Sequence, residues 1–209
     1  MYSVKIKICG ITNHDDALAC AEAGADYLGF IFYAGSRRYV APLRAARIIA
    51  SLPQGVIPVG VFVDESPGAI ERAIGDSGVR MVQLSGNESP ETYRQIPLPM
   101  IKVIRASAGT EPSPWSDRDG LFARMVDGSG PGVFGGSGMA PDLSLACKLA
   151  GSGRLFLAGG LHPGNVAAQI ARIRPFAVDV TSGTEMRPGV KDHSLVSLFC
   201  TNVRSAYTH

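Results

Sequence analysis

The sequence predicts a single domain of the α/β class, folded as a closed barrel of eight parallel strands. Short apolar runs recur along the chain with the spacing of strands, and most segments between them have the pattern of helices. No linker or change of composition divides the 209 residues. A hydrophobic fraction of 45% is enough for one sizeable core. We therefore expect one (β/α)8 TIM barrel domain over residues 1–209.

The first predicted strand has two different faces. Ile6 and Ile8 alternate with Lys5, Lys7 and Cys9. The apolar pair should face the surrounding helices, and Cys9 should point inward at the mouth of the barrel. The other seven strands are expected at residues 26–32, 56–63, 79–84, 100–104, 123–126, 154–157 and 176–180.

Capping residues and glycines predict the ends of the helices. Thr12-Asn13-His14-Asp15 has the pattern of a capping box that opens a helix ending near Gly24, which predicts a structural role for Asp15. Ser66-Pro67 should open a helix that Gly75 or Gly78 ends. The Ser-, Pro- and Gly-rich segment 106–120 predicts an irregular crossover. Further helices are expected at 42–52, from 89, at 141–149, from 164 and at 193–207.

Composition and charge exclude several kinds of function. The chain has 20 basic and 18 acidic residues, a net charge of +2, and no basic run that would bind nucleic acid. No apolar stretch approaches the roughly 20 residues of a membrane span, and no signal-like segment opens the chain. The four cysteines and four histidines lack metal-ligand spacing. We expect a cytoplasmic protein with reduced thiols, no cofactor, no metal and neither a nucleic-acid nor a membrane partner.

The residues at the strand ends should form one pocket, because loops at the carboxyl ends of barrel strands converge on one face. A thiolate at Cys9 could take a proton from carbon, and a protonated carboxyl group at Asp127 could give one to oxygen. This pairing suits an isomerase that needs no cofactor. Asp127 could instead cap a helix or pair with an arginine. Arg38 could instead be a solvated charge in a loop.

Glycine-rich turns predict a phosphorylated small-molecule substrate. Gly159-Gly160 and Ser182-Gly183 follow the seventh and eighth strands, where barrels of this kind bind phosphate through backbone N–H groups. Segment 128–138 contains six glycines and is interpreted as an active-site loop, with a plain surface loop as the alternative. Arg37 and Arg38, after the second strand, suit an acidic group on the substrate.

Several motifs together resemble those of the phosphoribosylanthranilate isomerase family, in order from residue 5 to about 200. They are Lys7-Ile8-Cys9-Gly10-Ile11-Thr12, Val82-Gln83-Leu84-Ser85-Gly86, Asp127 followed by Gly135-Gly136-Ser137-Gly138, Leu157-Ala158-Gly159-Gly160-Leu161 with Asn165-Val166, Asp179-Val180-Thr181-Ser182-Gly183-Thr184-Glu185, and Pro188-Gly189-Val190-Lys191-Asp192.

The resemblance implies the Amadori rearrangement of phosphoribosylanthranilate in tryptophan biosynthesis. Asp127 matches the family's general acid and Cys9 its base. Arg38 matches the arginine that meets the anthranilate carboxylate. The phosphate site corresponds to Gly160, Ser182 and Gly183, with the loop near Gly136. The resemblance is compatible with a monomer or a homodimer and with association with neighbouring enzymes of the tryptophan pathway.

The sequence departs from the family pattern at two motifs. Ser85-Gly86 stands where the family commonly has His-Gly, and Ser36-Arg37-Arg38 replaces Ser-Pro-Arg. Arg37 could therefore compete with Arg38 for the carboxylate.

Three rival functions remain. The related histidine-pathway aminoimidazole ribotide isomerase uses an aspartate as its base, so Cys9 argues against it. A metal-dependent epimerase would need histidine ligands at strand ends. The third is a non-catalytic phosphate-binding barrel.

Overall fold

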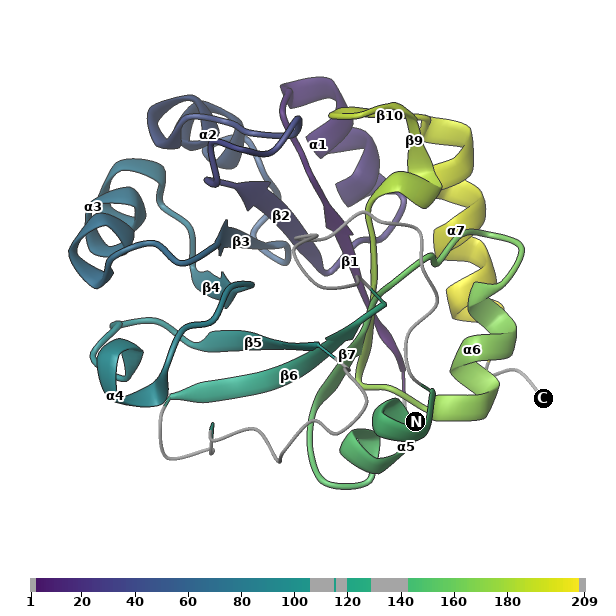
Figure 1. The fold of residues 1–209 in the computed structure, drawn as a ribbon. Coiled ribbons are helices and arrows are strands. Elements are labelled where there is room, and N and C mark those ends of the chain that lie inside the picture. Colours follow the sequence, from purple (N-terminus) through teal and green to yellow (C-terminus); the bar gives the residue numbers. More distant parts are fainter. Residues whose placement is uncertain (1–2, 106–114, 116–119, 129–142, 207–209) are drawn as a thin grey trace.

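The predicted fold class is confirmed: eight parallel strands close into a barrel in sequence order. The computed structural model describes residues 3–105, 115, 120–128 and 143–206 (Figure 1). Pairing of the first strand with the eighth closes the barrel, with Lys7 opposite Asp179. The strands are β1 (Lys5–Cys9), β2 (Tyr27–Ile31), β3 (Ile57–Phe62), β4 (Met81–Leu84), β5 (Met100–Arg105), β6 (Leu121–Asp127), β7 (Leu155–Leu157) and β8 (Ala177–Val180).

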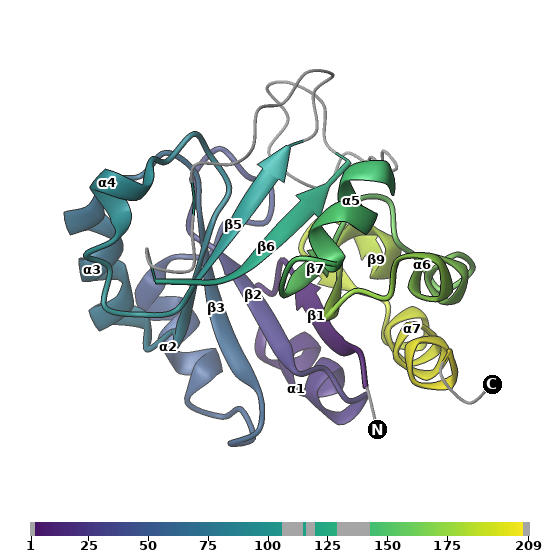
Figure 2. The same cartoon turned by 90° about the horizontal axis from the view of Figure 1, so that it is seen from below.

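Helices cover the outside of the barrel, with α2, α3 and α4 on one side and α5, α6 and α7 on the other (Figure 2). Their bounds agree with the sequence patterns to within a few residues. The helices are α1 (His14–Glu22), α2 (Pro42–Ile49), α3 (Pro67–Ser77), α4 (Pro90–Tyr93), α5 (Leu143–Ala150), α6 (Val166–Ile173) and α7 (His193–Ser205).

The two faces of β1 separate as the alternation predicts. Ile6 and Ile8 are fully buried in the layer between strands and helices, beside Ala17 and Cys20 of α1. Lys7 and Cys9, on the opposite face, are buried as well. A second apolar cluster, which includes Tyr27, Val59, Met81, Ile101 and Phe156, fills the barrel interior.

The predicted capping box is wrong by one residue. Asn13, not Thr12, caps α1, and its side-chain oxygen accepts from the Asp16 backbone N–H at 2.8 Å. The Thr12 hydroxyl donates instead to the Gly189 carbonyl at 2.5 Å, so a tertiary bond takes it away from the cap. Asp15 is solvent-exposed, and the structural role predicted for it belongs to Asp16.

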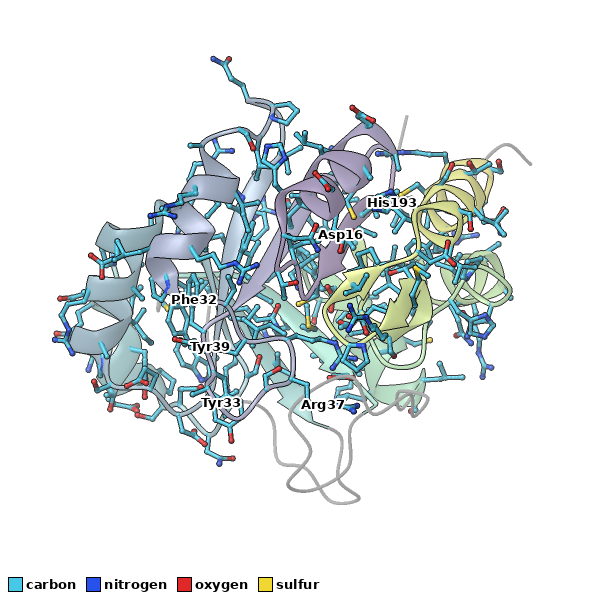
Figure 3. All side chains as sticks on the ribbon, turned by 90° about the horizontal axis from the view of Figure 1, so that it is seen from above. Asp16, Phe32, Tyr33, Arg37, Tyr39 and His193 are labelled. Carbon is cyan, nitrogen blue, oxygen red and sulfur yellow. The ribbon has the colours of Figure 1, made fainter. Side chains whose placement is uncertain are left out.

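Asp16 ties the beginning of α1 to the beginning of α7. Its carboxylate accepts from the Lys191 backbone N–H at 2.8 Å and lies 2.8 Å from the His193 ring Nε2. The two side chains lie close together in Figure 3. This contact joins the first and last helices across the seam of the barrel.

Local patterns missed a small hairpin between β8 and α7. A short 3₁₀ turn (Ser182–Thr184) leads into β9 (Glu185–Arg187), which pairs antiparallel with β10 (Val190–Lys191). Strand β6 also begins two residues earlier than expected and includes Asp127 as its last residue. Most of the predicted crossover at 106–120 and of the glycine-rich segment 128–138 falls outside the described residues.

Candidate active site

A cavity that is partly open to solvent lies at the carboxyl ends of the strands. Cys9 at the end of β1 and Asp127 at the end of β6 both line it. The structure therefore brings the predicted thiol and carboxyl group to one cavity. Other predicted residues lining it are Arg38, Gly160 and Ser182, whereas Gly136 lies outside the described residues.

The Cys9 thiol lies close to β2 because the facing residue, Gly29, has no side chain. Cys9 pairs with Gly29 across the β1–β2 ladder. A Cβ atom on Gly29 would lie 2.6 Å from the Cys9 sulfur and 3.1 Å from its Cα, both too close. The absence of a side chain at position 29 thus makes room for the thiol.

A buried ion pair lies beside the thiol. Lys7, two residues before Cys9 on the same strand face, is fully buried, and its Nζ is 2.7 Å from Asp179 Oδ1 on β8. The charge of Lys7 acts on the Cys9 thiol and lowers its pKa. Sequence reasoning did not assign Lys7 or Asp179 to the site. The period-two alternation in β1, which places Lys7 on the face of Cys9, was the available signal.

Burial dominates the titration of the thiol. It raises the pKa of Cys9, and the opposing charges of Lys7 and Lys191 offset only part of that effect, while the Asp179 carboxylate adds to it. The protonated thiol is therefore the resting form at neutral pH. The thiolate that a carbon acid requires must be stabilised locally.

Arg38 reaches the cavity, whereas Arg37 is exposed and does not line it. Figure 3 shows Arg37 in the loop that also carries Tyr33 and Tyr39. Arg38 forms a two-pronged ion pair with Glu185 of β9, with Nη2 2.8 Å from Oε2 and Nε 2.9 Å from Oε1. Within the described residues, Arg38 Nη1 makes no hydrogen bond, so this edge can meet a carboxylate.

Glu185 is a third residue that sequence reasoning did not assign to the site. Burial by itself raises its pKa, but the hydrogen bonds from Arg38 and the charge of Lys191 outweigh burial, and the pKa of Glu185 is lowered. The carboxylate is thus ionised at neutral pH and holds the Arg38 guanidinium in place. Lys191 Nζ lies 3.3 Å from Glu185 Oε1 and donates to the Cys9 and Thr181 carbonyls.

The turns after β7 and β8 approach each other closely. Gly159 and Gly160 have φ angles of +93° and +60°, in the left-handed region that favours glycine. A Cβ atom on Gly183 would lie 2.0 Å from the Leu161 carbonyl oxygen, so glycine is required there. Gly183 does not itself line the cavity, although Ser182 does. The backbone of both turns is therefore available at one end of the cavity.

The buried polar side chains of Gln83 and Ser85 also line the cavity. Gln83 Nε2 donates to the Ser85 hydroxyl at 3.0 Å. Ser85, at the position of the family histidine, points toward the cavity together with Gln83. Its hydroxyl keeps a polar contact there but carries no group that titrates near neutral pH.

The part of the chain that the structure describes contains neither a metal-ligand cluster nor a membrane-spanning helix. No group of three or more His, Cys, Asp or Glu side chains placed to hold a metal ion occurs in 3–105, 115, 120–128 and 143–206. In that part of the chain, no helix has the length and apolarity needed to cross a membrane.

Comparisons with known proteins agree with the geometry. Residues 6–202 match the family described as N-(5'-phosphoribosyl)anthranilate (PRA) isomerase. An N-(5'-phosphoribosyl)anthranilate isomerase from Trichlorobacter lovleyi is 42% identical over 97% of this chain and 99% of its own.

Two solved structures are each 38% identical to this chain, with a TM-score of 0.81, and cover 97% of it and 99% of their own chains. One is described as monomers of the dimeric phosphoribosylanthranilate isomerase from Thermotoga maritima. The other is a phosphoribosyl anthranilate isomerase in complex with reduced 1-(o-carboxyphenylamino)-1-deoxyribulose 5-phosphate. By sequence and by fold, this chain belongs to the N-(5'-phosphoribosyl)anthranilate isomerase family.

Proposed function

We propose that the protein catalyses the Amadori rearrangement of N-(5'-phosphoribosyl)anthranilate to 1-(2-carboxyphenylamino)-1-deoxyribulose 5-phosphate, a step of tryptophan biosynthesis. The observation that carries this proposal is the meeting of Cys9 and Asp127 in one cavity of a chain that belongs to this family. Chemistry, fold and family thus support the same reaction.

Asp127 acts as the general acid in the first step. Its carboxyl proton goes to the ring oxygen of the ribose while the bond from that oxygen to C1 breaks. The lone pair of the anthranilate nitrogen forms a double bond to C1, which gives an open-chain iminium ion. The step requires a protonated Asp127, which lines the cavity.

Cys9 acts as the base in the second step. Its thiolate takes the proton from C2, and the electron pair of that C–H bond neutralises the iminium to give an enolamine. The enolamine then tautomerises to the ketone, with one proton lost from the C2 hydroxyl and one gained at C1. A proton passes from Cys9 to Asp127 through solvent to restore the starting state.

The rest of the cavity holds the two ends of the substrate. The free edge of Arg38 meets the anthranilate carboxylate. Backbone groups near Gly160, Ser182 and Gly183 bind the phosphate, together with the loop near Gly136. Binding at both ends orients C2 of the sugar toward the Cys9 sulfur.

Two substitutions test the assignment of acid and base. Cys9→Ser and Asp127→Asn should each lose several orders of magnitude in kcat, because each removes a proton-transfer group. Both variants should still fold and bind a reduced product analogue. The matched controls are Cys147→Ser and Asp15→Asn, which change an exposed cysteine and an exposed aspartate.

Loss of anthranilate fluorescence on freshly formed phosphoribosylanthranilate measures turnover. Near-normal turnover in either active-site variant removes that residue from the mechanism. No turnover by the unmodified protein, with the analogue still bound, would favour the non-catalytic phosphate-binding barrel. Turnover of the aminoimidazole-bearing substrate alone would favour the histidine-pathway isomerase.

The reaction consists only of proton transfers, so we expect it to need neither metal nor organic cofactor. Extensive dialysis against a chelator should leave kcat and KM unchanged. Activity that is lost on dialysis and restored by a divalent cation would contradict the proposed chemistry.

We also propose that the enzyme works in the cytoplasm as a monomer or homodimer. A dimeric relative with the same fold supports the second state. Light scattering after size-exclusion chromatography distinguishes the two, and the same experiment with added tryptophan-pathway enzymes tests association.

A further inference from the structure

We infer that Lys7 is a positioning residue that makes the Cys9 thiolate available, and that Asp179 keeps Lys7 charged and limits the strength of its effect. The inference rests on the proposed function, in which Cys9 removes a proton from carbon. It gives a role to the buried ion pair of Lys7 and Asp179, which has no part in the proton transfers proposed for Cys9 and Asp127.

The geometry places Lys7 between the thiol and the carboxylate. Its side chain is completely buried on the face of β1 that also carries Cys9, and its Nζ lies 2.7 Å from Asp179 Oδ1. Its positive charge favours the thiolate form of Cys9, two residues further along the strand. Cys9 and Asp179 both line the cavity.

Four charged side chains act on Cys9 from the elements packed against it. Lys7 comes from β1, Asp179 from β8, Arg38 from the loop after β2 and Lys191 from β10. Arg38 is engaged by Glu185, and Lys191 donates to the Cys9 carbonyl rather than to its sulfur. Of these three cations, Lys7 has the largest effect on the pKa of Cys9.

Asp179 explains why Lys7 stays charged despite its burial. Burial, the largest single effect, would lower the pKa of Lys7, but the attraction and hydrogen bond of the Asp179 carboxylate, together with the interaction with Cys9, outweigh it, and the pKa is raised. When Cys9 loses its proton, the ammonium faces two anions instead of one. The thiolate gains an attraction to the ammonium that the neutral thiol lacks.

A structural explanation competes with this one, because the pair also crosses the β1–β8 seam. A buried ion pair is a poor source of stability, since desolvation of both charges offsets their attraction and apolar residues of similar size often do as well. A purely structural pair also predicts no change in the titration of the thiol. The two explanations therefore differ in a measurable quantity.

The test follows the thiolate absorbance of Cys9 against pH in a protein with Cys20, Cys147 and Cys200 replaced by Ala. In Lys7→Met, the midpoint should rise by about one pH unit or more, because the thiolate loses its cation. In Asp179→Asn, the midpoint should shift less than in Lys7→Met, because removal of the carboxylate's repulsion opposes the loss of the partner that keeps Lys7 charged. A purely structural contact predicts no shift in either variant.

Lys5→Met is the matched control, because Lys5 lies on the same strand in a half-exposed pair with Asp26. It should leave the midpoint unchanged. With the native cysteines present, Lys7→Met should lower kcat at neutral pH about tenfold or more, regain part of it at alkaline pH, and leave KM nearly unchanged. Circular dichroism and thermal unfolding verify that each variant is folded.

Should Lys7→Met unfold because it leaves the Asp179 carboxylate buried alone, the double variant Lys7→Met/Asp179→Leu removes both charges. Its midpoint should also lie above that of the parent, because the attraction of Lys7 exceeds the repulsion of Asp179. An unchanged midpoint in folded Lys7→Met or in the double variant overturns the inference. Absence of turnover in the parent would instead refute the proposed reaction, and the titration would still decide the role of Lys7.

Discussion

At the scale of single residues, two adjacent arginines have different surroundings. Arg38 lines the cavity with a free guanidinium edge, whereas Arg37 is exposed. Arg38→Ala should raise KM about tenfold to a hundredfold, because hydrogen bonds to a charged group contribute about 1.5–3 kcal/mol. Its kcat should change less. Arg37→Ala is the matched control, with KM expected within about twofold of the parent under the same assay.

Steady-state kinetics over a wide range of substrate concentrations measure both variants. A larger effect from Arg37→Ala would reverse the assignment of the carboxylate site. Arg37, and not Arg38, would then be the residue that binds the anthranilate carboxylate.

At the scale of elements, the contact between β1 and β2 depends on Gly29. Gly29→Ala places a methyl group 2.6 Å from the Cys9 sulfur, so the thiol or the strand must move. We expect a loss of about 1–3 kcal/mol in the free energy of unfolding, typical of overpacking. Turnover should fall as well, because the thiol is displaced from the reacting carbon.

The control for Gly29→Ala is Gly75→Ala in α3, where an added Cβ meets nothing within 4 Å. That change should stabilise the protein by about 1 kcal/mol through helix propensity and leave turnover unchanged. Urea unfolding of both variants measures the difference. Equal stability of Gly29→Ala and the parent would show that the strand pair adjusts freely and that the glycine is not required.

At the scale of the whole molecule, buried thiols should make the protein less stable at alkaline pH. Burial raises the pKa of Cys20 in α1 to about 12 and that of Cys200 in α7 to about 11, from a value of 9.0. Above pH 9 the unfolded chain therefore releases protons that the folded protein keeps. Stability is full below pH 9 and decreases toward pH 11–12, by about 1.4 kcal/mol per pH unit for each thiol.

Thermal unfolding between pH 8 and 11 checks this expectation. The double variant Cys20→Ala/Cys200→Ala should show a shallower decline of Tm with pH than the parent, whereas Cys147→Ala, at an exposed site, should follow the parent. Parallel curves for the parent and the double variant would exclude these thiols as the cause.

The sequence by itself determined the barrel and the convergence of most candidate site residues on one cavity. Apolar periodicity and caps predicted the order of strands and helices, because both depend on residues that are close in the chain. Cys9, Asp127, Arg38, Gly160 and Ser182 were placed on one cavity for a topological reason, since the carboxyl ends of all barrel strands share one face. Family motifs added the roles that the residue types alone left open.

Only the tertiary structure decided which charges meet. Lys7 and Asp179 are 172 positions apart, and Arg38 and Glu185 are 147 apart. The first pair depends on the register between β1 and β8 at the barrel seam, and the second on a hairpin that local patterns did not predict. No periodicity encodes such a meeting, because it depends on how the closed sheet aligns distant strands and on burial that makes an unpaired charge too costly.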